Sequence, residues 1–72
     1  MKLVEIGRRH SIGATPEQKA KIEINTRLAK DFADVVEGHC PDSPDRKAAL
    51  DFIEQALDRA NAAVRNGDEV EW

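Results

Sequence analysis

Residues 38–45, Gly-His-Cys-Pro-Asp-Ser-Pro-Asp, hold the signals that end one helix and begin another. Glycine is common where a helix ends, so Gly38 predicts a stop. Ser43 followed by Pro44 is typical of an N-cap and the first helical position. Because only a short loop, residues 39–43, separates the stop from the start, we expect two antiparallel helices that lie side by side.

The outer ends of these two helices carry similar signals. Thr15-Pro16-Glu17-Gln18 reads as an N-cap, a proline at the first position, an acidic first turn and a glutamine able to close a capping box. Gly67 predicts the final stop. We therefore expect an all-α, antiparallel two-helix hairpin over residues 15–67, with helices at about 16–38 and 44–66, an N-terminal arm at 1–14 and an acidic tail at 68–72.

The N-terminal arm has a short apolar opening, Leu3, Val4 and Ile6, followed by Gly7 and a basic run. A strand, a short helix and an irregular arm all agree with this pattern. The sequence leaves these three alternatives open.

The apolar faces of both helices are too wide for one packing partner. They cover arcs of roughly 220° and 200° at about 100° per residue, whereas one partner needs little more than about 100°. We therefore expect a homo-oligomer, with a dimeric four-helix bundle as the minimum. In the alternative interpretation, the N-terminal arm covers the second face.

The helix at 44–66 has two adjacent apolar seams. We expect the alanine-rich seam to pack inside the hairpin, because alanines permit close backbone approach, and the bulkier seam to face a second chain. The seams are Ala49, Ile53, Ala56, Ala60 and Ala63, and Leu50, Ile53, Leu57, Ala60 and Val64.

Composition excludes several classes of protein. The 72 residues carry a net charge of −3, one cysteine and few aromatics, which argues against disulfides, a closed zinc site and binding of long nucleic acid. No membrane span or signal peptide is evident, so we expect a cytoplasmic protein. His39 and Cys40 suit neither a nucleophile–base pair nor a metal cage, and no phosphate-binding glycine loop is present. We expect a binding protein without cofactor or catalytic residues.

Basic residues gather where the first helix begins and the second ends. Such a pole, between subunits, could hold a small polyphosphorylated or cyclic phosphate ligand, helped by the free N–H groups of a helix start. A solvated charged surface is the other interpretation. The pole contains Lys19, Lys21, Arg59 and Arg65, and the arm adds Arg8, Arg9 and His10.

Motifs over about residues 15–66 resemble a known family. They are Thr15-Pro16-Glu17-Gln18, Cys40-Pro41-Asp42-Ser43 and Ala60-Asn61-Ala62-Ala63, with Arg46, Leu50, Glu54 and Ala56 at matching spacing. Together they resemble small hairpin proteins encoded by many phages, which include anti-CBASS and anti-Thoeris sponges that sequester cyclic nucleotide signals of bacterial immunity. The resemblance implies a hairpin that assembles through its helices, as dimers and often hexamers, and binds its ligand intact between protomers.

The resemblance also suggests ligand-binding positions. Family sponges often carry an aromatic residue and a basic residue that fall here near Ser11 and Thr26, with His10 and Arg27 next to them. An arginine near a second family pocket is retained as Arg65. We expect phosphate contacts from Arg8, Arg9, Arg27 and Arg65 and base or ribose contacts from His10 and Asn61. Ser11 and Thr26 are counted as ligand-binding positions because they occupy the places of the family's aromatic and basic residues, although neither has the matching side chain.

Two functions of different classes follow. The first is a non-enzymatic sponge for cyclic oligonucleotides or cyclic ADP-ribose-like molecules, which blocks anti-phage defence in the host cytoplasm. The second is a structural or adaptor hairpin that binds a protein partner and no nucleotide. Hydrolysis of the signal is disfavoured because the sequence offers no catalytic set.

Overall fold

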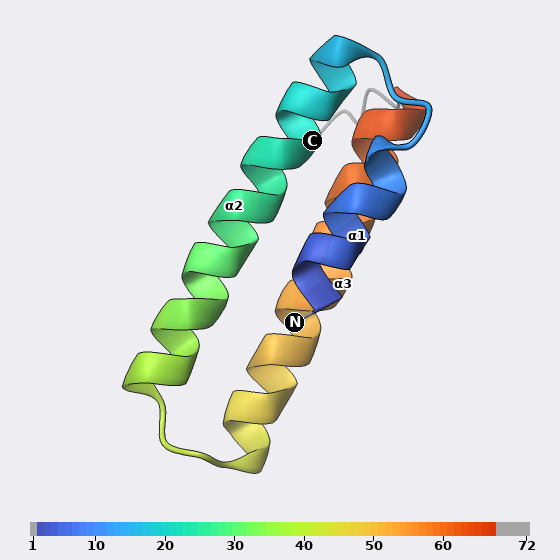
Figure 1. The fold of residues 1–72 in the computed structure, drawn as a ribbon. Coiled ribbons are helices and arrows are strands. Elements are labelled where there is room, and N and C mark those ends of the chain that lie inside the picture. Colours follow the sequence, from blue (N-terminus) through green and yellow to red (C-terminus); the bar gives the residue numbers. More distant parts are fainter. Residues whose placement is uncertain (1, 68–72) are drawn as a thin grey trace.

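The computed structural model describes residues 2–67, which form three helices and no strand: α1 (Lys2–Ser11), α2 (Pro16–His39) and α3 (Pro44–Asn66) (Figure 1). The expected tail, residues 68–72, lies outside the described residues. α2 and α3 are the antiparallel pair expected from the sequence. Within the described residues, no helix is both long and apolar enough to cross a membrane.

Local side-chain chemistry starts the two long helices where the sequence predicts. The Thr15 hydroxyl accepts from the Gln18 backbone N–H at 3.1 Å, and the Gln18 side chain accepts from the Thr15 backbone N–H at 2.9 Å. This is the expected capping box. Ser43 caps α3 by accepting from the backbone N–H of Arg46 at 3.2 Å.

One of the two predicted stops is correct. Gly67 ends α3 in the left-handed conformation at φ 63°, and its N–H donates to the carbonyls of Ala63 and Val64. Gly38 is not the stop of α2: it stays helical, and the Cys40 N–H still donates to Val36 at 3.0 Å. The helix therefore ends just before Pro41, whose ring and missing N–H prevent its continuation.

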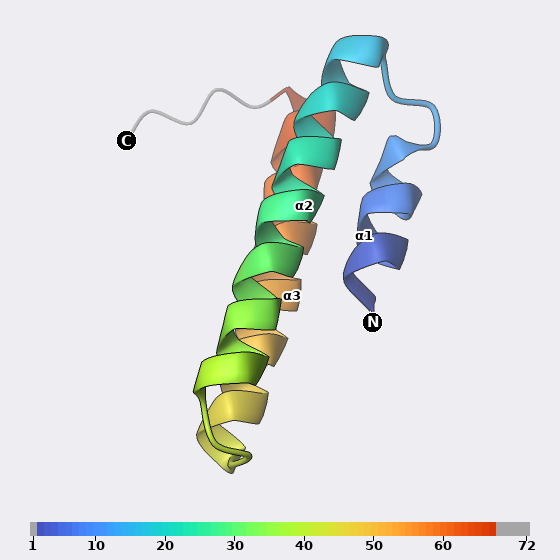
Figure 2. The same cartoon turned by 60° about the vertical axis from the view of Figure 1, so that its left-hand side comes forward.

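The N-terminal arm is a helix that belongs to the core. α1 runs antiparallel to α2 and parallel to α3, beside the half of the hairpin where α2 begins and α3 ends (Figures 1 and 2). Leu3 is only 1% exposed and packs into a cluster with Ala33, Val36, Ile53 and Leu57. A third helix thus covers one apolar side of the hairpin, as the alternative interpretation proposed.

The bulkier α3 seam lies in the core and does not face a second chain as expected. Ile53 and Leu57 are buried and Leu50 packs against the same core, whereas Ala56 and Ala60 are exposed. The reason is α1: with a third helix present, the bulkier side chains fill the interior between three helices. The small alanines are left on the outer face.

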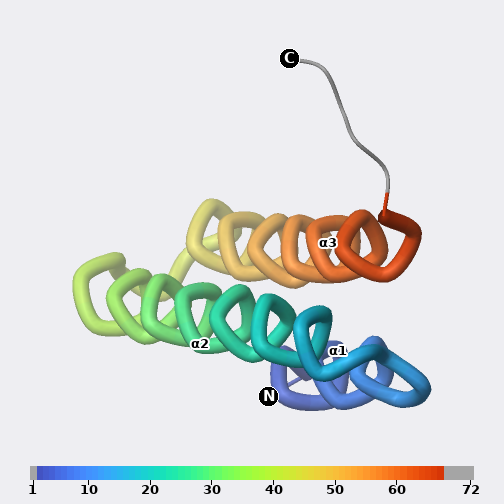
Figure 3. Tube along the Cα trace, turned by 90° about the horizontal axis from the view of Figure 1, so that it is seen from above, coloured from blue at the N-terminus to red at the C-terminus, as the bar shows by residue number. Residues whose placement is uncertain are grey.

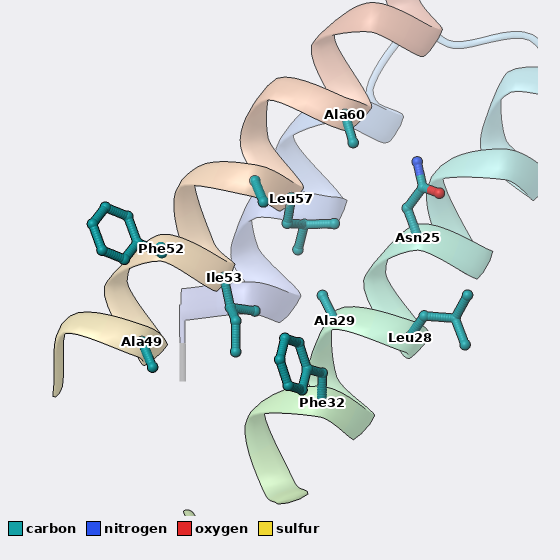
Figure 4. A pocket seen from close by; sticks show the side chains of 10 residues that line it. Asn25, Leu28, Ala29, Phe32, Ala49, Phe52, Ile53, Leu57 and Ala60 are labelled. Carbon is teal, nitrogen blue, oxygen red and sulfur yellow. The ribbon is translucent and has the colours of Figure 1, made fainter. Parts of the chain in front are cut away.

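A groove of about 630 Å³ lies between α2 and α3, lined mainly by apolar side chains, and we call it the apolar groove (Figure 4). Phe32 and Phe52 are 59% and 67% exposed at its rim, and Leu28 is 61% exposed. The arm therefore covers one apolar face but leaves another open. The groove is lined by Asn25, Leu28, Ala29, Phe32, Ala49, Phe52, Ile53, Ala56, Leu57 and Ala60.

Candidate anion-binding site

A second cleft, with a volume of about 490 Å³, lies between α1 and α2, and we call it the basic cleft. Its volume falls within the range of small-molecule sites in proteins. Seen from above, α1 packs beside the first turns of α2 (Figure 3). Its lining consists of Val4, Gly7, Arg8, Ser11, Lys19, Ile22, Glu23, Thr26, Arg27 and Lys30.

The lining has an excess of positive charge. Arg8 comes from α1, whereas Lys19, Arg27 and Lys30 come from α2, and Glu23 is the one carboxylate among these residues. None of the four cations forms an ion pair with another described residue. Four cations that form no ion pair within residues 2–67, beside a single carboxylate in the lining, make this cleft suitable for a phosphate-bearing ligand.

Two hydroxyl groups complete the cleft. Thr26 donates its hydroxyl to the Ile22 carbonyl at 2.8 Å, and Ser11 donates to the Gly7 carbonyl at 2.9 Å. Because each hydroxyl uses its only O–H in this bond, its oxygen can act toward a ligand only as a hydrogen-bond acceptor. The cleft can thus offer cations to phosphate oxygens and hydroxyl oxygens to the O–H or N–H groups of the same ligand.

Arg9 and His10 face α3 instead of the basic cleft. The Arg9 guanidinium and His10 Nε2 both lie 2.8 Å from one oxygen, Oδ1 of Asp58. The hydrogen bond from His10, with added hydrogen-bonding and charge effects from Arg9, holds the pKa of Asp58 below its usual 3.8, although desolvation opposes this shift. These contacts tie α1 to α3.

Arg65 and Asn61 also act inside the fold. Arg65 donates to the carbonyls of His10 at 2.7 Å and Ile12 at 2.6 Å, and so satisfies backbone acceptors at the end of α1. Asn61 is fully buried and accepts from Asn25 Nδ2 at 3.1 Å, while its own Nδ2 has no hydrogen-bond partner among residues 2–67. In this arrangement the eight expected residues divide: Arg8, Ser11, Thr26 and Arg27 line the cleft, and Arg9, His10, Asn61 and Arg65 make contacts within the fold.

The described residues contain no group of three or more His, Cys, Asp or Glu side chains that could hold a metal ion. His10, the histidine nearest the basic cleft in sequence, is engaged with Asp58.

Comparison with models of known families shows to which family the chain belongs. The sequence model of the Acb2/Tad1 hairpin domain matches residues 2–65. The chain belongs to the Acb2/Tad1 hairpin family. This confirms the resemblance drawn from the Thr15 and Cys40 motifs, and the family is that of the anti-CBASS and anti-Thoeris sponge proteins. No curated protein and no solved structure matches the chain.

The family match extends over α1, which the sequence comparison of residues 15–66 left out. In this Acb2/Tad1 hairpin, sequence reasoning overlooked Lys30 and placed Lys19 only in a general basic pole. Both could have been found from helical spacing, because Lys19, Glu23, Thr26 and Lys30 succeed one another at intervals of three or four residues along one face of α2. That face becomes a cleft wall only because α1 packs next to it.

Proposed function

We propose that the chain is a non-enzymatic sponge that binds a cyclic nucleotide immune signal intact and removes it from anti-phage defence in the host cytoplasm. The observation that carries the proposal is the basic cleft of an Acb2/Tad1 family member. Arg8, Arg27, Lys19 and Lys30 would bind phosphates, and Ser11 and Thr26 would accept from ribose or base. Sequestration is stoichiometric, so this function needs tight binding and abundant protein.

Titration calorimetry against cyclic di-AMP, cyclic di-GMP, cyclic GMP–AMP, cyclic tri-AMP and cyclic ADP-ribose tests the proposal directly. We expect at least one of them to bind and to be recovered unchanged when the complex is heated. Absence of heat with every member at micromolar protein would discard the sponge function, and a cleaved ligand would contradict its non-enzymatic character.

Paired charge variants test the location of the site. Arg27→Gln and Lys30→Gln each remove one cation from the cleft, and each should weaken binding about tenfold, the effect of losing a hydrogen bond to a charged group. Lys47→Gln is the matched control, because Lys47 is exposed on α3 and outside the cleft lining. If all three variants bind equally well, the ligand lies elsewhere.

We also propose that the protein is a homo-oligomer, between a dimer and a hexamer, whose protomers meet through the apolar groove. The exposed rings of Phe32 and Phe52 and the open alanine seam support this proposal. Contiguous apolar patches are rarely left open on monomers.

The apolar groove also favours the second candidate function, an adaptor that binds a protein partner. This version predicts an assembly that includes another chain and shows no affinity for cyclic nucleotides. The calorimetric panel separates the two functions, since only the sponge releases heat with a nucleotide.

A further inference from the structure

We propose that Gly7 is a positioning residue of the basic cleft. By lacking a side chain, Gly7 lets α1 approach Thr26 closely enough to set the width of the cleft. The expected effect on ligand affinity rests on the proposed function. The expected effect on the packing of α1 against α2 does not.

The contact between Gly7 and Thr26 leaves no room for a methyl group. A Cβ on Gly7 would overlap Thr26 Oγ1 and lie 3.0 Å from Cγ2 and 3.2 Å from Cβ. All three side-chain atoms of Thr26 therefore face the glycine. The helices could accommodate an added methyl only by moving apart or by displacing Thr26.

Thr26 is a stiff neighbour. Its side chain branches at Cβ, which restricts rotation in a helix, and its hydroxyl is engaged with the Ile22 carbonyl at 2.8 Å. Turning the side chain away would break this hydrogen bond. Relief of an overlap therefore falls mainly on α1.

Backbone conformation does not explain the glycine. Gly7 lies inside α1, whereas the glycines with positive φ are Gly13 at 74° and Gly67 at 63°. Glycine inside a helix costs about 1 kcal/mol relative to alanine. Close approach to α2 is the structural reason for accepting this cost, because Gly7 is buried against Thr26.

The cleft depends on this approach because its α1 wall surrounds the glycine. Val4, Arg8 and Ser11 flank Gly7 along α1, and they face Thr26, Arg27 and Lys30 of α2 across the cleft. On its other side α1 is anchored to α3 through Asp58 and Arg65. An added methyl at Gly7 should therefore tilt α1 away from α2 and move Arg8 away from the three cations of α2.

A double-mutant cycle tests this arrangement, with Gly7→Ala, Thr26→Ala and the double variant. Gly38→Ala is the matched control, because Gly38 is also helical and a Cβ there meets nothing within 4 Å. Cyclic GMP–AMP is the probe for affinity by calorimetry. Hydrogen exchange of the α1 amides, without any ligand, reports the packing of α1.

We expect Gly7→Ala to weaken binding roughly tenfold and to speed exchange in α1, as an overpacked contact does. In the Thr26→Ala background the same change should have an effect of about twofold or less on both readouts, because the remaining contact is a Cβ 3.2 Å away that can give slightly. Gly38→Ala should leave affinity and α1 exchange unchanged.

The two readouts separate failure of this inference from failure of the proposed function. If Gly7→Ala leaves α1 exchange unchanged, or if its effects are the same with and without the Thr26 side chain, Gly7 does not position α1. If wild type gives no heat with cyclic GMP–AMP, binding of this ligand fails, and the exchange cycle still decides the role of Gly7 in packing. Faster exchange with unchanged affinity would overturn the link to the cleft.

Discussion

At the residue scale, Asp58 holds α1 on the hairpin. One carboxylate oxygen accepts from both Arg9 and His10 at 2.8 Å, although the carboxylate is about half exposed. Arg9 and His10 were expected to meet a ligand, and the structure uses them to meet Asp58. A basic residue next to a predicted site can thus serve the scaffold that positions the site.

The lowered pKa of Asp58 predicts a pH dependence of stability. A carboxyl with a depressed folded-state pKa stabilises the fold above its unfolded value, and this stabilisation is lost as the pH falls through the folded value. For Asp58 the loss begins near its usual 3.8 and continues below it. Wild type should therefore exceed Asp58→Asn in melting temperature at pH 6, and the difference should shrink below about pH 4. A difference independent of pH would contradict the ionic role.

Asn61 is a second residue whose role depends on the tertiary structure. It is fully buried, and its Nδ2 finds no hydrogen-bond partner in the part of the chain that the structure describes. Its one bond, at 3.1 Å, comes from Asn25, which is half-buried at the apolar groove. A buried amide of this kind destabilises the fold while it can fix the register of packed helices.

Asn61→Leu should raise the free energy of unfolding by about 1 kcal/mol, because it replaces an unsatisfied buried amide by an apolar group of similar size. Chemical denaturation measures the change. Asn25→Leu is the comparison, and it should instead lower the free energy of unfolding, because it leaves the buried Asn61 Oδ1 without its partner as well. If Asn61→Leu is less stable than wild type, the hydrogen bond between Asn25 and Asn61 stabilises the fold by more than the unpaired Asn61 Nδ2 destabilises it.

At the element scale, capping sets where α2 and α3 begin. The side chains of Thr15 and Gln18 each accept from the other's backbone N–H. At α3 only one such bond forms, from the Arg46 backbone N–H to the Ser43 hydroxyl. These interactions span three residues, which is why they can be read directly from the sequence. The end of α2 was misjudged by one residue because the following proline, and not Gly38, is the stronger breaker.

Replacing the cap of α2 tests this reading. Thr15→Ala should lower the free energy of unfolding by about 1 kcal/mol, whereas Thr15→Gly should cost only a few tenths, as is usual for N-caps. Equilibrium unfolding in urea gives both values. No loss in Thr15→Ala would mean that the Thr15 hydroxyl does not support the helix.

At the scale of the whole molecule, the three helices bury one apolar side of the hairpin and leave the apolar groove open. Its rim carries Phe32 and Phe52, both more than half exposed. The expectation of an oligomer came from the excess width of the apolar faces. It stays a prediction, now attached to a definite surface.

Phe52→Asp should dissociate the proposed oligomer into monomers at micromolar concentration, because it replaces an exposed ring at the rim of the groove by a charge that assembly would have to desolvate. Light scattering after size exclusion measures the mass. Ile12→Asp is the control, since Ile12 is 72% exposed but lies outside the groove. A monomeric wild-type protein, or equal masses for both variants, would contradict assembly through the groove.

By itself the sequence determined the all-helical hairpin, the starts of α2 and α3, the left-handed end at Gly67 and the family. These features depend on contacts within three or four residues, or on motifs at fixed spacing. Only the tertiary structure decided that the arm is a helix in the core, which α3 seam is buried, and which of the expected residues share a cleft. The physical reason is distance along the chain. Gly7 contacts Thr26, and His10 contacts Asp58, only after α1 has packed on the hairpin, and interactions between neighbouring residues do not determine where α1 packs.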